Sequence, residues 1–293
     1  MNPTANGSSL EDRLRRHVAT LAGEPRPAGS PAHRHAASYI RRHLEQAGFT
    51  VTNHAVDEAG FVGHNLLTTP IPERAEFPLF IVAAHYDSIS GSPGADDNAS
   101  AVAALLEVAA VLGPELDSTE RTPRCRLQLA AYDLEESGLV GSFVHCRELG
   151  QARTPVRGMI SLEMLGYTDS RPGSQRLPPH LAGLYPDVGN FIGVCANEDS
   201  RGLLATVVEG LKTVRGLPVE HIAVPGTGEL LYETRLSDHS SFWDRGYQAL
   251  MITDTSFFRN PHYHQPTDTP DTLDYGFLTK VTMGVCEAVR RLV

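Results

Sequence analysis

The stretch that decides the fold is Pro78-Leu-Phe-Ile-Val-Ala-Ala84, followed at once by His85-Tyr86-Asp87. A continuous apolar run between a proline and a polar loop is typical of a strand buried on both faces. Residues two apart on an extended chain point to the same side, so His85 and Asp87 can face one point at the end of the strand. Open α/β sheets bind ligands at the carboxyl ends of their strands. The stretch therefore predicts a central strand with a functional site at its end.

The segments on either side of this strand alternate between strand and helix patterns. Apolar residues at helical spacing, with caps or glycine stops, predict helices over 31–47, 98–113, 138–149 and 200–214, with Asn98 as a cap and Gly113-Pro114 as a terminator. Short apolar runs predict strands over 49–51, 126–132, 158–163 and 249–253. Strands that alternate with helices indicate an α/β sandwich.

Length and composition indicate one globular domain. A chain of 293 residues lies at the upper end of what one hydrophobic core supports, so we expect a single domain over 1–293. Residues 166–190 are rich in Pro, Gly and Ser, and a connection of that length predicts a rim or lid. Apolar residues make up 41% of the chain, and no stretch approaches the roughly 18 apolar residues of a membrane span, so no membrane partner is expected.

The charge distribution argues against a nucleic-acid partner, and the N-terminal residues and the cysteines favour a reducing compartment. The net charge is −10, and the 25 Lys and Arg residues form no basic run longer than a pair. The first residues lack the basic-then-apolar order of a secretory signal, which favours a cytoplasmic protein, or a secreted one if a leader has been removed. The cysteines have no CxxC spacing and fit reduced thiols, so any metal must use His and carboxylate ligands; they are Cys125, Cys146, Cys195 and Cys286.

Acidic residues and histidines gather where the predicted strands end. One loop contains Asp96 and Asp97, the pair Glu135-Glu136 follows the strand 126–132, and Glu163 ends the strand 158–163. Taken singly, each acid could equally cap a helix or be solvated. A late loop adds His262, Tyr263 and His264. Together these donors describe a nitrogen- and oxygen-ligated site, which suits zinc with open positions for water and substrate.

Most other histidines have the setting of surface or structural residues. The sequence contains thirteen, so no single one is informative. The structural group comprises His17, His33, His35, His43, His54, His64, His145, His180 and His221.

Three motifs in order resemble the M28 family of zinc aminopeptidases. The HxD motif is His85-Tyr86-Asp87, the acidic loop reads GADDNASA over 94–101, and the stretch EESGLVGS covers 135–142. The resemblance extends from about Gly29 to Tyr275 and implies a three-layer sandwich with a mostly parallel mixed sheet. It also implies two zinc ions per chain and a peptide substrate with a free N-terminus.

The resemblance also implies a role for each motif residue. His85 and Glu136 would each bind a different metal, and Asp97 would bridge the two. Glu135 would be the general base that activates water, while Asp87 would orient His85. His264 matches the family's terminal histidine ligand, which makes Tyr263 the expected hydrogen-bond donor to the oxyanion. In the alternative assignment, His262 and His264 swap roles.

Two positions depart from the family pattern. Glu163 stands where the family has Asp as the second metal's terminal ligand, and its extra methylene can alter the metal spacing. Ala101 replaces a glycine at the end of the acidic loop and is expected to be neutral. The family's SDHxxF stretch is present over 237–242, and we expect it to support the pocket without binding metal.

Other activities remain to be weighed against peptide hydrolysis. A glutaminyl cyclase with one zinc uses a similar scaffold, and carboxypeptidase or dipeptidase specificity would be set by pocket residues alone. The sequence has neither GxSxG nor HExxH, and Asp238-His239-Ser240 in direct succession cannot form a triad. A non-enzymatic binding module would have lost ligands, yet here every ligand position holds a competent donor.

Overall fold

One mixed sheet of eight strands runs through the computed structural model, which describes residues 8–116 and 123–293. The strand order across the sheet is β1-β2-β4-β3-β5-β8-β6-β7. The strands are β1 (Val51–Glu58), β2 (Phe61–Thr68), β3 (Leu79–His85), β4 (Arg126–Tyr132), β5 (Val156–Glu163), β6 (Ile192–Asn197), β7 (Val219–Val224) and β8 (Ala249–Thr253).

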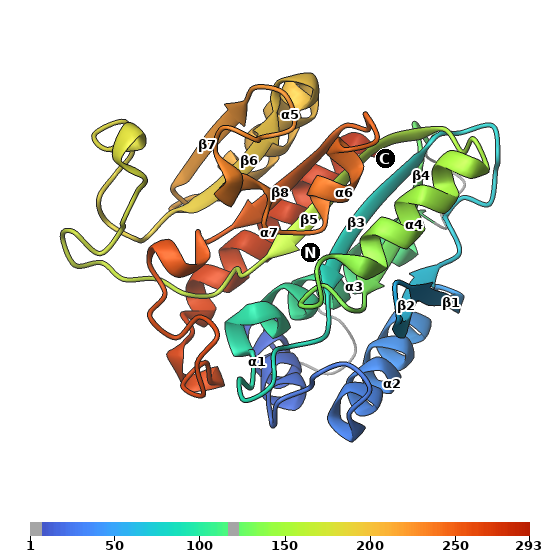
Figure 1. Cartoon of the computed structure of the whole chain (residues 1–293), viewed down its shortest axis with the longest axis horizontal. Helices are drawn as coiled ribbons and strands as arrows, with labels where there is room; N and C mark the ends of the chain where they lie inside the picture. Colours follow the sequence, from blue (N-terminus) through green and yellow to red (C-terminus); the bar gives the residue numbers. More distant parts are fainter. Residues whose placement is uncertain (1–7, 117–122) are drawn as a thin grey trace.

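The centre of the sheet is parallel. Strands β4, β3, β5 and β8 are parallel neighbours, while β1–β2, β2–β4 and β6–β8 pair antiparallel. All seven residues of β3 are buried, as expected for a strand covered on both faces. Because β4, β3, β5 and β8 run in one direction, their carboxyl ends meet at one edge of the sheet (Figure 1).

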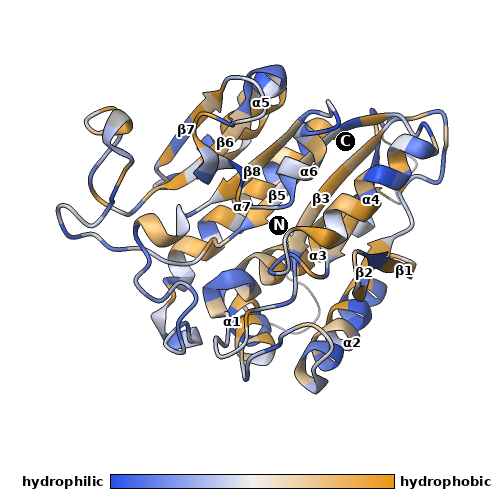
Figure 2. Ribbon diagram, viewed as in Figure 1, coloured by the Kyte–Doolittle hydropathy of each residue, from blue (hydrophilic) through white to orange (hydrophobic). Residues whose placement is uncertain are grey.

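Helices cover both faces of the sheet and make the three-layer sandwich that the motifs implied. One core contains residues of α1, α2, α3, α5 and α7, and the other contains residues of α4 and α6. The central strands are largely hydrophobic (Figure 2). The helices are α1 (Leu10–Leu21), α2 (Pro31–Gln46), α3 (Ala101–Leu116), α4 (Val140–Gln151), α5 (Arg201–Lys212), α6 (His239–Trp243) and α7 (Tyr275–Leu292).

Helix α3 corrects the expectation that no segment is long and apolar enough to cross a membrane. Within the described residues, the helical stretch Ala95–Leu116 passes that test by length and composition. However, 72% of its apolar window is buried inside the fold, and α3 packs against β3 and α7. Burial in the protein accounts for its apolar character, as it does for a core helix.

The start of α3 also differs from the prediction. Asn98 was expected to cap the helix, but its side chain bonds to the end of β5 instead: Nδ2 donates to the Leu162 carbonyl (3.0 Å) and Oδ1 accepts from the Met164 amide (2.9 Å). A separate turn, Ala95–Ser100, precedes α3, which then continues past Pro114 to Leu116. The elements α1, β2, β6, β7, α6 and α7 were not predicted.

Candidate metal centre

The predicted donor residues come from the ends of four adjacent strands. His85 is the last residue of β3 and Glu163 the last of β5, while Glu135 and Glu136 lie in the loop that follows β4. His264 lies in the loop after β8. Asp97 belongs to the turn Ala95–Ser100, which follows β3. The parallel order β4-β3-β5-β8 therefore brings distant parts of the sequence to one edge of the sheet.

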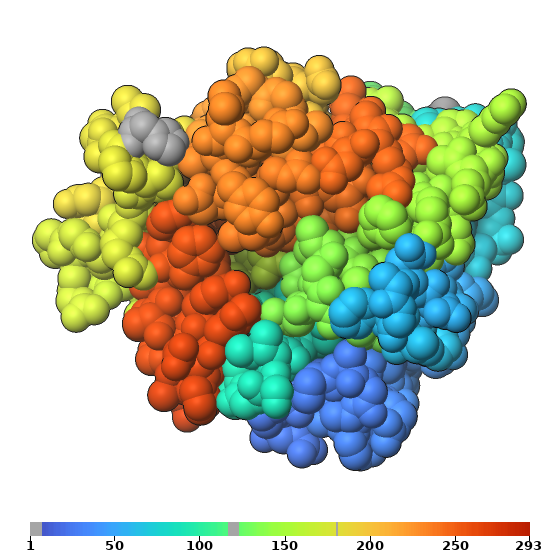
Figure 3. All heavy atoms as spheres, in the orientation of Figure 1, coloured from blue at the N-terminus to red at the C-terminus, as the bar shows by residue number. Residues whose placement is uncertain are grey.

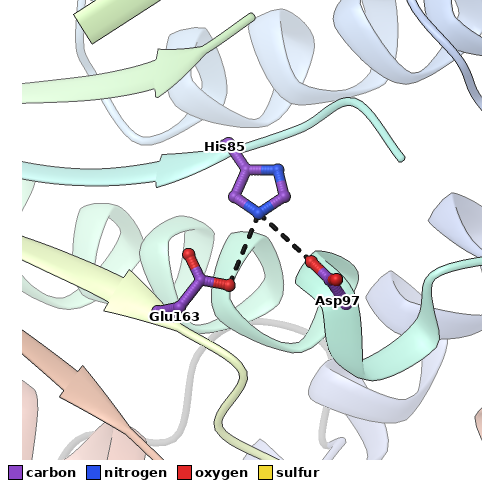
Figure 4. A group of neighbouring side chains, drawn as sticks. All are labelled: His85, Asp97 and Glu163. Carbon is purple, nitrogen blue, oxygen red and sulfur yellow. Dashed lines mark ion pairs between the residues drawn. The ribbon is translucent and has the colours of Figure 1, made fainter. Parts of the chain in front are cut away.

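The side chain of Asp97 lies between two groups of donors. Its Oδ1 is 3.2 Å from Nε2 of His85, and that nitrogen is 3.5 Å from Oε1 of Glu163 (Figure 4). On the other side, Oδ2 of Asp97 is 3.1 Å from Nε2 of His264, which lies 3.2 Å from Oε2 of Glu136. In each group the donor atoms lie within 4.8 Å of one another, a spacing suited to one metal ion.

Negative charge exceeds positive charge at this centre. The carboxylates of Asp97, Glu136 and Glu163 share two imidazoles, and Glu136 Oε1 is buried without a hydrogen-bond partner in the described residues. Burial raises the pKa of Glu136 and of Glu163. Burial opposes protonation of His264, but the carboxylates of Asp97 and Glu136 raise its pKa to about 10. Divalent cations would supply the missing positive charge, so the donor set fits metal binding.

Glu135 lies beside these donors but belongs to neither group. Its Oε2 is 3.9 Å from His85 Nε2, and its side chain is 12% exposed. Burial, followed by repulsion from Glu163 and other nearby carboxylates, raises the pKa of Glu135 well above its usual value, although His85 acts in the opposite direction. A carboxyl group with a raised pKa suits proton transfer near neutral pH.

Asp87 contacts the loop that carries both glutamates. Its two carboxylate oxygens accept the backbone N–H groups of Glu135 and Glu136, each at 3.2 Å. Its Oδ1 lies 3.5 Å from Nδ1 of His85, which is longer than a normal hydrogen bond. Asp87 therefore positions the two glutamates, and its role in orienting His85 stays a prediction.

Three residues that the sequence reasoning did not assign hold the turn that carries Asp97. The Asp268 carboxylate accepts the backbone N–H groups of Asp96 (2.9 Å) and Asp97 (3.1 Å). The buried Arg26 side chain donates to the carbonyls of Tyr86 (2.8 Å) and Gly94 (2.9 Å), which fixes the start of the turn. Gly94 has φ 62°, and a Cβ there would lie 2.2 Å from the Asp97 carbonyl oxygen, so only glycine fits. Asp268 stands near the histidines in sequence, whereas Arg26 gave no signal.

The SDHxxF stretch touches the centre through Ser237. Its hydroxyl donates to Oε2 of Glu163 (2.8 Å) and lies 2.9 Å from the hydroxyl of Ser161. Glu163 thus turns Oε1 toward His85 while Ser237 holds its other oxygen. This contact agrees with the supporting role expected for the stretch.

The two histidines of the late loop differ in position. His264 approaches Asp97, and the ring of Tyr263 stacks on it with centroids 3.8 Å apart. His262 instead places Nδ1 2.9 Å from the Thr267 hydroxyl and belongs to neither donor group. The geometry therefore favours His264 over His262 as the donor.

A cleft opens from the donor groups toward β6 and β7. It contains about 1040 Å³ of empty space, counted out to its open mouth. Figure 3 shows a hollow in this face of the molecule, between the red, orange and green segments. Residues of the 166–190 segment form part of its wall, namely Gln175, Leu177, Pro178, Leu181 and Tyr185.

This arrangement has the make-up of a metal-dependent hydrolase: an α/β sandwich with His and carboxylate donors at its strand ends, beside a glutamate with a raised pKa. Comparison with known proteins also indicates a metal-dependent hydrolase. The model of Peptidase family M28 matches residues 67–289. The uncharacterized protein YfbL of Escherichia coli is 39% identical over 85% of this chain and 77% of its own length. The chain therefore belongs to peptidase family M28 and is a metallopeptidase.

More distant relatives have named activities. Leucine aminopeptidase 1 of Arthroderma otae is 28% identical over 73% of this chain, which spans about half (54%) of that relative. A zinc aminopeptidase of Bacillus subtilis has a similar fold, with a TM-score of 0.73 at 14% identity over 96% of this chain and 95% of its own. A glutaminyl cyclase of Porphyromonas gingivalis gives a TM-score of 0.69 at 17% identity over 98% of this chain and 100% of its own. These two structures support the fold alone.

Proposed function

We propose that this chain is an aminopeptidase that removes N-terminal residues from peptides and uses two zinc ions. The observation that carries the proposal is the position of Asp97. Its two oxygens face two separate donor groups, His85 with Glu163 and His264 with Glu136. A carboxylate shared in this way can bridge two metal ions, which is the arrangement of two-metal hydrolases.

The donor chemistry suits zinc. Both groups offer only imidazole nitrogen and carboxylate oxygen, and each provides three protein ligands, which leaves a position open for water or substrate. When bound, zinc would lower the pKa of water and polarise the scissile carbonyl.

The protein's own residues then supply proton transfer and positioning. Glu135 would accept the proton of the attacking water and pass it to the leaving amine. Tyr263 lines the cleft beside His264, and its hydroxyl would donate a hydrogen bond to the developing oxyanion. The free amino group of a peptide would lie at the Glu163 end of the centre, which restricts cleavage to the terminal residue.

The second donor group separates this proposal from the cyclase alternative. A cyclase with one zinc needs one ligand set, whereas Glu136 and Glu163 stand on opposite sides of Asp97. Carboxypeptidase and dipeptidase activities share the metal ligands and differ in substrate, so a substrate panel tells them apart.

The proposal is tested by hydrolysis of aminoacyl-anilides, N-blocked peptides and dipeptides by the zinc-loaded protein, before and after chelation. We expect hydrolysis of substrates with a free N-terminal residue, aminoacyl-anilides included, and none of N-blocked peptides, with the activity abolished by chelator and restored by zinc. Glu135→Gln should keep its zinc and lose about 10²- to 10⁴-fold in kcat. Full activity of Glu135→Gln would overturn the assignment of the base, and cleavage of N-blocked peptides alone would overturn the aminopeptidase proposal.

A further inference from the structure

A row of residues runs across four adjacent strands from the metal centre to the far wall of the cleft. In the sheet register, Glu163 pairs with Thr253, Thr253 with Gly193, and Gly193 with Glu220. Paired residues on neighbouring strands project to the same face of a sheet. All four line the cleft, so the row forms its floor, with Glu163 at one end and Glu220 at the other.

The floor between the two glutamates is low and its surroundings are apolar. Gly193 has no side chain, and Thr253 is small, so nothing in this row blocks the path from Glu163 to Glu220. The next row of the floor and the side walls are largely hydrophobic; they include Met251, Cys195, Ile222, Phe191, Phe257 and Phe258.

Glu220 ends this path as a carboxylate without a cation. Its side chain is half-buried, and it has no hydrogen bond or ion pair with another residue of the described ranges. The described cleft lining includes no Lys or Arg, and it contains a further acid, Glu233. Tyr185 of the 166–190 segment donates to the His221 carbonyl (3.1 Å), so this residue contacts β7 next to Glu220.

We infer that the cleft takes an N-terminal residue with a long cationic side chain, arginine or lysine, whose head group pairs with Glu220. The inference rests on the proposed aminopeptidase function, which places the substrate's amino group at the Glu163 end. The Cα atoms of Glu163 and Glu220 are three strand spacings apart, about 14 Å. A short side chain ends over Gly193, whereas arginine and lysine cross it, with their methylenes on apolar walls and their charge at the carboxylate.

The test compares kcat/KM for arginyl-, lysyl-, norleucyl- and leucyl-anilides, because norleucine has a straight side chain without charge. The variant is Glu220→Gln, which keeps the size of the side chain and removes its charge. The matched control is Glu198→Gln, which makes the same change in net charge at an exposed site outside the cleft. We expect Glu220→Gln to lower kcat/KM for arginine and lysine by roughly 10- to 100-fold, the range for a hydrogen bond to a charged group. Norleucine should change by less than about twofold, as should all substrates with the control.

Binding of free L-arginine and L-norleucine, measured by calorimetry, gives a readout that does not depend on hydrolysis. Wild type should bind arginine more tightly, and Glu220→Gln should bind the two equally. If no anilide is hydrolysed but this preference holds, the aminopeptidase proposal fails and the Glu220 site stands. If leucine and norleucine are hydrolysed as fast as arginine, and Glu220→Gln changes nothing, the inference fails while the proposed function stands.

Discussion

Two buried clusters of His and acidic residues in this molecule differ in how their charges are balanced. Between α1 and α3, the single carboxylate of Glu107 accepts a paired hydrogen bond from Arg13 (2.9 and 2.8 Å to Oε2) and one contact from His17 (3.2 Å). At the strand ends, Asp97, Glu136 and Glu163 share His85 and His264, and Glu135 adds a further acid.

The difference separates a structural cluster from a functional one. Burial alone would raise the pKa of Glu107, yet its contacts with His17 and Arg13 lower it, so the fold favours the charged form of Glu107. At the metal centre, burial raises the pKa of Glu136 and Glu163, and only the pKa of Asp97 is lowered, because its contacts with His264 and His85 outweigh burial. The first cluster is complete in the protein, whereas the second requires cations from outside.

Among the variants that test this difference, Asp97→Asn should have the largest effect, which falls on zinc content and activity. The substitution removes the charge from the only carboxylate that faces both donor groups among the described residues. We expect loss of both zinc ions and a fall in kcat/KM of at least about 10³-fold, as for the loss of a major electrostatic stabiliser. Zinc content and anilide kinetics measure it, and a variant with both metals and full activity would contradict the bridging role.

Glu107→Gln tests the cluster of Arg13, His17 and Glu107, where we expect a loss of stability and no loss of zinc. The variant leaves the partly exposed Arg13 without a charged partner, so we expect the free energy of unfolding to fall by about 2 kcal/mol. Zinc content should stay at the wild-type level, because Glu107 contacts no donor residue. Urea denaturation with a zinc assay on the same sample checks both, and loss of zinc without loss of stability would reverse our assignment.

His145 provides a histidine whose described partner is a hydroxyl instead of a carboxylate. Its Nδ1 lies 2.9 Å from the Tyr132 hydroxyl, and burial, followed by repulsion from His54, lowers its pKa to about 3. Between pH 6.5 and 3, the His145 imidazole binds a proton in the unfolded chain but not in the folded one. The contribution of His145 to the free energy of unfolding is therefore complete above pH 6.5 and is lost as the pH falls. Lowering the pH to 5 should cost about 2 kcal/mol through this residue.

The comparison of wild type with His145→Gln in urea denaturation at pH 7 and pH 5 measures that loss. The stability of the variant should fall less between the two pH values than that of wild type. Equal losses in both proteins would show that His145 is not the group responsible.

Ser237→Ala should give the smallest effect. The variant removes the hydroxyl that holds Oε2 of Glu163, so the affinity for one zinc should fall roughly 10-fold while the other is unchanged. Competition with a zinc chelator resolves the two affinities. An equal loss at both sites would indicate a general structural defect. No loss at either site would show that Ser237 does not support zinc binding.

The sequence predicted the sheet best where burial makes strands uniformly apolar. The runs at 78–84, 126–132 and 249–253 lie in β3, β4 and β8, because buried parallel strands need no polar face. Strand β7 was missed because it mixes polar and apolar residues, and its side chains are mostly partly exposed. Strand β6 is six residues long and contains Gly193, which weakens a strand pattern.

The donor residues were predictable because they lie at or near the ends of apolar strands or stand in short motifs. Their partners were harder to find. Arg26 acts through backbone carbonyls far along the chain, and such contacts leave no sequence pattern. Asn98 looked like a helix cap because its side chain suits one, but it bonds to β5, which only the tertiary fold brings near. The expected cytoplasmic location stays a prediction.

Zinc stoichiometry tests the central claim most directly: that Asp97 joins two separate donor groups. Zinc per chain would be measured by native mass spectrometry for wild type, Glu136→Ala and Glu163→Ala, with Glu107→Gln as a control outside the centre. The account predicts two zinc ions in wild type and the control, and one in each alanine variant. One zinc in wild type, or two in both alanine variants, would contradict it.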